Sequence, residues 1–75
     1  MEHDQELDAR GLLCPLPVLK TAKALRALDA GTVLKVLTDD PAAIIDMPHY
    51  CNESGNAYLG VEDADGAQAH FLKKT

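Results

Sequence analysis

Aromatic residues are few in this sequence, and long hydrophobic runs are absent. Among 75 residues there are two tyrosines, one phenylalanine and no tryptophan, so Leu, Val, Ile and Ala must build most of the core. No apolar stretch approaches the roughly 20 residues of a membrane-spanning helix. The first residues, MEHDQELD, are acidic where a secretory signal is basic and then apolar. We therefore expect a cytoplasmic protein without membrane association.

Cysteine is scarce as well, because Cys14 and Cys51 are the only two in the chain. Cytoplasmic thiols are kept reduced, so a structural disulfide between them is not favoured. A metal site needs three or four converging ligands, and the H-x-C pair of His49 and Cys51 supplies two. His3 is distant in sequence, and His70 lies in a predicted strand, where it is expected at the surface or at an edge. We predict no metal and no cofactor.

Negative charge dominates the chain, with a net charge of −5 at pH 7. That balance argues against direct nucleic-acid binding. Between Asp8 and Asp29, however, there is no acidic residue, and Cys14 lies in this segment. Its cations are Arg10, Lys20, Lys23 and Arg26. They form either an ordinary solvated helix face or a docking surface for an acidic partner protein, and both interpretations stay open.

The periodicity of apolar residues predicts the element order β-α-β-α-β-β. Strands are expected at 5–9, 32–38, 57–62 and 68–74, with one helix after Cys14-Pro15 and another after Asp39-Asp40-Pro41. The acidic turn at 63–66 contains Asp-Gly, which favours a hairpin. The simplest arrangement is one domain over residues 1–75, with a single sheet, both helices on one face and 1–4 as a flexible tail.

A proline at the start and a glycine at the end delimit the first predicted helix. Proline is favoured at the first helical position, so Cys14 is expected at the N-cap with Pro15 following it. Gly31 is a natural end of this helix. The helical apolar positions are Val18, Ala22, Leu25 and Leu28, with Leu19 on their flank.

In the second helix, Asp39-Asp40-Pro41 is interpreted as a helix cap rather than as a catalytic carboxylate pair. Pro48 is expected to break or kink this helix, with a further turn before Gly55.

The stretch GLLCPLPVL, residues 11–19, places a thiol between an apolar run and two prolines. A helix N-terminus and the nearby Arg10 and Lys20 would favour the thiolate, which is the nucleophilic form of cysteine. Pro17 has no N–H to offer the sulfur, so the first turn is expected to be irregular. The prolines would hold Cys14 at a stiff corner, with Gly11 permitting the turn before it.

No general base lies close to Cys14 in sequence, and His3 or His49 could approach only through folding. The alternative is that Cys14 is a small buried residue. Cys51 is interpreted as a packing residue, with a resolving thiol for Cys14 as the second interpretation.

The chain resembles the TusA/SirA family of small sulfur carrier proteins. The resemblance rests on LDARGLLCPLPVLKTAKAL and LDAGTVLKVLTDDPAAIIDMPHYC and runs from Leu7 to Lys74. The motif L-D-x-x-G-x-x-C-P-x-P is fitted in full, as are D-D-P and D-x-P-x-x-C. The resemblance implies an α+β two-layer sandwich, with a four-stranded mixed sheet and two helices on one face.

It also implies that Cys14 carries a persulfide, with Pro15 and Pro17 as its presenting frame. The expected partners are a cysteine desulfurase or rhodanese-type sulfur donor and an acceptor sulfurtransferase of the DsrE-like kind. The protein would act as a monomeric carrier rather than a self-contained enzyme, in tRNA thiolation, molybdenum cofactor synthesis or sulfur oxidation. Leu16 departs from the glutamate frequent in thiouridine-pathway carriers, which leaves the acceptor open.

Two other functions compete with a sulfur relay. Small β-α-β-α-β-β sandwiches can bind RNA or act as regulatory modules, but an RNA module has no need of a thiol between prolines. Cys14 and Cys51 could instead form a reversible disulfide in a redox switch.

Overall fold

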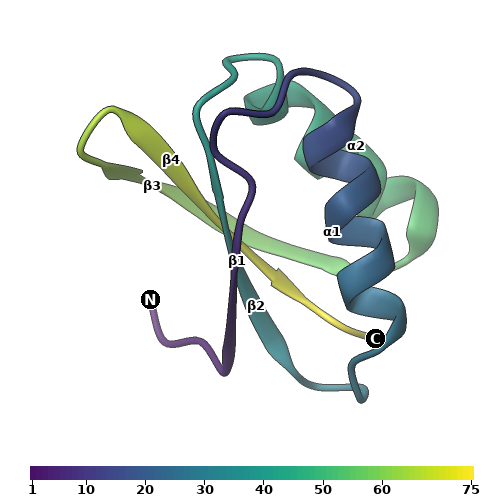
Figure 1. Ribbon diagram of the computed structural model, residues 1–75. Helices are drawn as coiled ribbons and strands as arrows, with labels where there is room; N and C mark the ends of the chain where they lie inside the picture. The colour runs from purple at the N-terminus through teal and green to yellow at the C-terminus, as the bar shows by residue number, and fades with distance from the viewer.

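The computed structural model describes the whole chain, residues 1–75. The chain forms a four-stranded sheet with both helices on one face (Figure 1). The elements are β1 Gln5–Asp8, α1 Leu16–Arg26, β2 Val33–Thr38, α2 Ala43–Ser54, β3 Ala57–Ala64 and β4 Ala67–Lys73. Across the sheet the strand order is β1-β2-β4-β3, with β1 parallel to β2 and the other neighbours antiparallel. The predicted α+β sandwich and element order are confirmed.

The core lies between the sheet and the two helices. Strand β2 alternates strictly, with Leu34, Val36 and Thr38 buried and the residues between them half-buried. Because strand side chains alternate between faces, one face of β2 points at the helices. The core cluster consists of Ala9, Leu25, Leu34, Val36, Ala43, Met47, Cys51 and Leu72. Its three α2 members are four residues apart, which places them on one helix face.

The buried face of α1 is formed by Pro17, Thr21 and Leu25. Only Leu25 belongs to the predicted apolar set, whose other members are half-buried. The buried stripe is therefore rotated from the expected one and includes a threonine. Thr21 is tolerated there because its hydroxyl donates a hydrogen bond of 2.7 Å to the Pro17 carbonyl, which leaves no buried donor unpaired.

Of the predicted break or kink at Pro48, the break is wrong, because α2 runs on to Ser54. A proline inside a helix deprives the carbonyl four residues earlier of its N–H donor. That carbonyl belongs to Ile44, whose side chain is 45% exposed, so water can reach this part of the helix. The helix ends, as expected, at Gly55, which has φ 84° and whose N–H donates to the Cys51 carbonyl.

The hairpin between β3 and β4 turns on Asp65 and Gly66. Both have positive φ, 52° and 86°, as a two-residue type I′ turn requires. This hairpin inserts β4 between β2 and β3, so His70 lies in an interior strand. The expectation of a surface or edge position for His70 is wrong. It is fully buried, with Nε2 2.9 Å from the Thr38 hydroxyl and Nδ1 2.8 Å from that of Tyr58.

The N-terminal segment runs beside the start of β2. The N–H of Asp4 donates to the Val33 carbonyl, and the Val33 N–H donates to the Asp4 carboxylate, each at 2.9 Å. His3 lies near Phe71, with ring centroids 6.1 Å apart. The flexibility expected for residues 1–4 stays a prediction. Neither helix has the length and apolar content that a membrane crossing requires.

Candidate functional site around Cys14

Cys14 lies exposed in the loop between β1 and α1, two residues before the helix. The N-cap position is occupied by Pro15, and no side chain caps the helix, so the predicted N-cap role of Cys14 is wrong. The Leu16 N–H donates to the Leu13 carbonyl and closes a separate turn before the helix. The first helical hydrogen bond follows it and runs from the Leu19 N–H to the Pro15 carbonyl. The irregular entry expected from the prolines is confirmed. The Cys14–Pro15 peptide bond is cis.

The loop that bears Cys14 is fastened to the loop between β2 and α2. The Cys14 N–H donates to the Asp40 carboxylate at 2.7 Å, and the Gly11 N–H donates to that of Asp39 at 2.9 Å. Asp40 also accepts the Ala42 N–H at 3.1 Å, just before α2 begins at Ala43. The predicted capping of α2 by these aspartates is wrong, because the N-cap is Ala42 and no side chain caps the helix. Their larger structural role, a connection between two loops, was not predicted.

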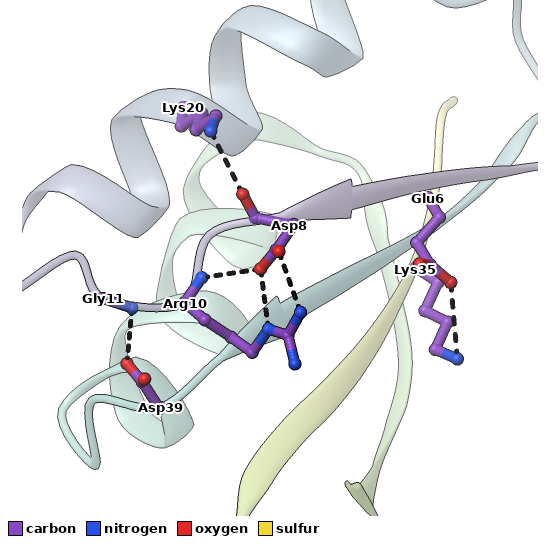
Figure 2. A network of polar contacts seen from close by, with 7 residues as sticks. All are labelled: Glu6, Asp8, Arg10, Gly11, Lys20, Lys35 and Asp39. Carbon is purple, nitrogen blue, oxygen red and sulfur yellow. Dashed lines mark hydrogen bonds and ion pairs between the residues drawn. The ribbon is translucent and has the colours of Figure 1, made fainter.

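A second network holds the start of this loop (Figure 2). Arg10 donates two hydrogen bonds to the Asp8 carboxylate, at 2.9 and 3.0 Å, and Lys20 donates to the Asp8 carbonyl at 3.1 Å. The hydrogen bonds from Arg10 lower the pKa of Asp8 to about 2. Arg10 and Lys20 are therefore engaged with Asp8. Lys23 and Arg26 lie exposed in the last turn of α1, farther along the helix.

Carboxylates face the Cys14 thiol. The Cys14 Sγ donates a hydrogen bond to the Asp46 Oδ2 at 3.0 Å. This bond, followed by partial loss of water and by the negative charges of Asp46 and Asp40, raises the pKa of Cys14. The prediction that the thiolate is favoured is wrong. Folding brings the acidic start of α2 to the sulfur, while the cations nearest in sequence pair elsewhere.

An open cavity of about 310 Å³ adjoins Cys14. It is lined by residues of the α1 entry and of α2, namely Cys14, Pro15, Val18, Asp46, His49, Tyr50 and Glu53. The α2 members flank the buried face of the helix, and two of the lining residues, Val18 and Tyr50, also pack against the core. His49 has reached the neighbourhood of Cys14 through folding, whereas His3 lines a different hollow beside Val33.

Exposed apolar side chains occur on the same loop and helices. Leu13 and Leu19 are 71% and 57% exposed, and Ile45 of α2 is 75% exposed. Leu16 is also exposed. This exposed apolar surface was not predicted from the sequence. The sequence does contain a signal for it, because Leu13 and Leu16 flank the cysteine and lie outside the predicted apolar stripe of the first helix.

Cys51 is on the core face of α2, 2% exposed, and burial raises the pKa of its thiol to about 11. Its interpretation as a packing residue agrees with this position. Cys14 and Cys51 are both free thiols. The cavity and Cys51 lie on different faces of α2, so the structure does not bring the second thiol into the site. No group of three metal-ligating side chains occurs in the chain.

Fold and site together define a small α+β domain that presents one accessible cysteine at the entry of its first helix. Residues 5–74 match the family described as Sulfurtransferase TusA. The sulfur carrier protein TusA of Allochromatium vinosum is 41% identical over 73 residues, which cover 97% of this chain and 95% of that protein. The chain belongs to the TusA family of sulfur carrier proteins, as its motifs predicted.

Two further comparisons agree with this assignment. A longer relative from Aquifex aeolicus is 40% identical over 74 residues, and the match spans 38% of that protein. The crystal structure of the SirA-like protein from Desulfitobacterium hafniense superposes with a TM-score of 0.81 at 28% identity. That match covers 93% of this chain and 96% of the solved chain.

Proposed function

We propose that Cys14 is the sulfur-carrying residue of this protein and holds the transferred sulfur as a persulfide. The observation that supports this most strongly is the contrast between the two cysteines. Cys14 is exposed on a loop fastened at both sides, and Cys51 is buried in the core with a pKa of about 11. Only one thiol is therefore accessible to a partner.

The transfer conserves atoms and electrons. In loading, the Cys14 thiolate attacks the outer sulfur of a donor persulfide, R–S–SH. The new bond gives Cys14–S–SH, the donor S–S bond breaks, and the donor leaves as its thiolate. In unloading, an acceptor thiolate attacks the outer sulfur of Cys14–S–SH, and Cys14 returns as the thiolate. No external oxidant or reductant is needed.

The rigid loop suits presentation of the sulfur to another protein. Pro15 and Pro17 offer no N–H to the sulfur, Gly11 supplies a positive φ of 81°, and Asp40 fixes the Cys14 backbone. The only group hydrogen-bonded to the sulfur is the Asp46 carboxylate, which accepts a hydrogen bond from the thiol and favours its protonated form. Groups that activate the thiol are therefore expected from the partner.

The partners we propose are a cysteine desulfurase or rhodanese-type donor and a DsrE-like acceptor sulfurtransferase, in the cytoplasm. The routes we propose end in thiolated tRNA, the molybdenum cofactor or sulfur oxidation, and Leu16 does not distinguish among them. The exposed Leu13, Leu16 and Leu19 provide an apolar contact surface beside Cys14, which such proteins could cover. The docking role of Lys23 and Arg26 remains a prediction.

The test is intact-protein mass spectrometry after incubation with a cysteine desulfurase and cysteine. We expect the mass of one added sulfur, located on Cys14, removed by reductant and absent from Cys14→Ser. Cys51→Ala is the matched control and should still gain sulfur. A wild-type protein that gains none from any persulfide donor, but rapidly forms a Cys14–Cys51 disulfide, would instead be a redox switch.

A further inference from the structure

The strongest unassigned feature of the site is the hydrogen bond from the Cys14 thiol to Asp46. The Sγ–Oδ2 distance of 3.0 Å is short for a sulfur donor, and Asp46 belongs to the first turn of α2. The two residues are 32 positions apart in sequence, and the loop bonds of Asp39 and Asp40 bring them together. Neither residue is fully buried. The contact is therefore built by the fold and can also be broken without unfolding it.

This contact distinguishes the two chemical states of the carrier. A neutral thiol donates its proton to the carboxylate and is held at the cavity. A persulfide is a stronger acid than the thiol from which it forms, so at neutral pH its outer sulfur is an anion. An anion has no proton to donate, and it is repelled by a carboxylate at hydrogen-bonding distance.

We propose that Asp46 is a positioning residue that holds the unloaded Cys14 as a thiol and disfavours the loaded persulfide at the same place. The inference rests on the proposed function, because it assigns Asp46 a role in the sulfur cycle of Cys14. Loading would break the Cys14–Asp46 hydrogen bond and turn the outer sulfur towards solvent and the acceptor. The unloaded thiol would be protected from unspecific reaction.

The other ionisable groups near Cys14 are consistent with this role. From the β2–α2 loop, Asp40 binds the Cys14 N–H, and from α2, His49, Tyr50 and Glu53 line the same cavity. Lys20 of α1 donates to the Asp8 carbonyl, and Arg10 pairs with the Asp8 carboxylate. The only ionisable side chain hydrogen-bonded to the sulfur is Asp46.

The first measurement is the rate of iodoacetamide alkylation at Cys14 against pH, followed by peptide mass spectrometry so that Cys51 is scored separately. In Asp46→Asn the alkylation midpoint should move to lower pH, because the close negative charge that disfavours the thiolate is removed. The rate at pH 7 should rise about tenfold for each unit by which the thiol pKa falls. Glu53→Gln is the matched control, since Glu53 lines the cavity without bonding the sulfur. It should change the rate by less than about twofold.

The second measurement is the equilibrium of sulfur exchange with glutathione persulfide at pH 7, read as the loaded fraction by intact mass. Asp46→Asn should raise the exchange constant several-fold, and Asp46→Glu should restore most of the wild-type value. Asp46→Ala, which also suits a helix, keeps the test valid if the asparagine variant folds poorly.

The two proposals fail separately. If the wild type gains sulfur on Cys14 but Asp46→Asn matches it in both measurements, the role of Asp46 is overturned and the carrier function stands. If the wild type gains no sulfur from any donor, the carrier function fails whatever the alkylation profile shows.

Discussion

The backbone N–H of Cys14 donates to the Asp40 carboxylate at 2.7 Å, which joins two loops 26 residues apart in sequence. The same carboxylate accepts the Ala42 N–H at 3.1 Å, next to the start of α2. One side chain therefore positions the reactive loop and orders the helix entry. A carboxylate can make both bonds because it has two acceptor oxygens, one for each N–H.

Replacing Asp40 by alanine should destabilise the protein by about 2 kcal/mol, because two hydrogen bonds to a charged acceptor are lost. It should also increase hydrogen exchange at the Cys14 amide. Urea unfolding and amide exchange measured by NMR check these effects. Asp39→Ala loses only the bond to Gly11 and should cost about 1 kcal/mol or less. Equal effects of the two substitutions would contradict the double role of Asp40.

The Asp8–Arg10 pair should be visible as a depressed carboxylate titration. The pKa of Asp8 is lowered from 3.8 to about 2, mainly by the Arg10 hydrogen bonds. A depressed carboxyl pKa contributes stability above the unfolded value of 3.8, and this contribution is lost as the pH falls through about 2. In Arg10→Gln the Asp8 midpoint, followed by NMR, should return towards 3.8. Because the pair is exposed, high salt should shift the wild-type midpoint in the same direction.

His70 should make the protein sensitive to mild acid. Burial lowers the pKa of His70 below its ordinary value of 6.5, so the unfolded chain binds a proton more readily than the folded one. Stability is unaffected by this group above pH 6.5 and decreases as the pH falls below it, until the folded pKa is reached. Urea unfolding from pH 8 to pH 5 measures the slope.

His70→Gln can keep hydrogen bonds to Thr38 and Tyr58 while removing the titration. Its stability should therefore depend less on pH over the same range. An NMR titration that places the His70 midpoint at or above 6.5 would be incompatible with this account.

Cys51 should matter for packing and not for sulfur chemistry. Cys51→Ser places a hydroxyl in the core cluster beside Met47 and should cost about 1–3 kcal/mol in unfolding free energy. Cys51→Ala should cost less, about 1 kcal/mol, since it removes one small buried group. Both folded variants should gain sulfur on Cys14 as the wild type does. Loss of loading in Cys51→Ala, with its fold intact by circular dichroism, would give Cys51 a role in the transfer.

The elements that local chemistry controls could be predicted closely. Strand β2 follows from its alternating β-branched and apolar residues, the hairpin from Asp65-Gly66, and the end of α2 from Gly55. The predictions that failed depended on neighbours from elsewhere in the chain. His70 was buried because β4 inserts between two strands, and Asp39 and Asp40 bind the loop of Cys14 instead of capping α2.

At the site, the sequence by itself determined which cysteine is the candidate carrier and what frames it. Cys14 between an apolar run and two prolines, in the motif of a sulfur carrier family, follows from residues adjacent in the chain. Only the tertiary structure decided the electrostatics of the sulfur. The cations next to Cys14 in sequence turn to Asp8, and Asp40 and Asp46 arrive from 26 and 32 residues away. Charges act through distance in space, and that distance is set only when the loops meet.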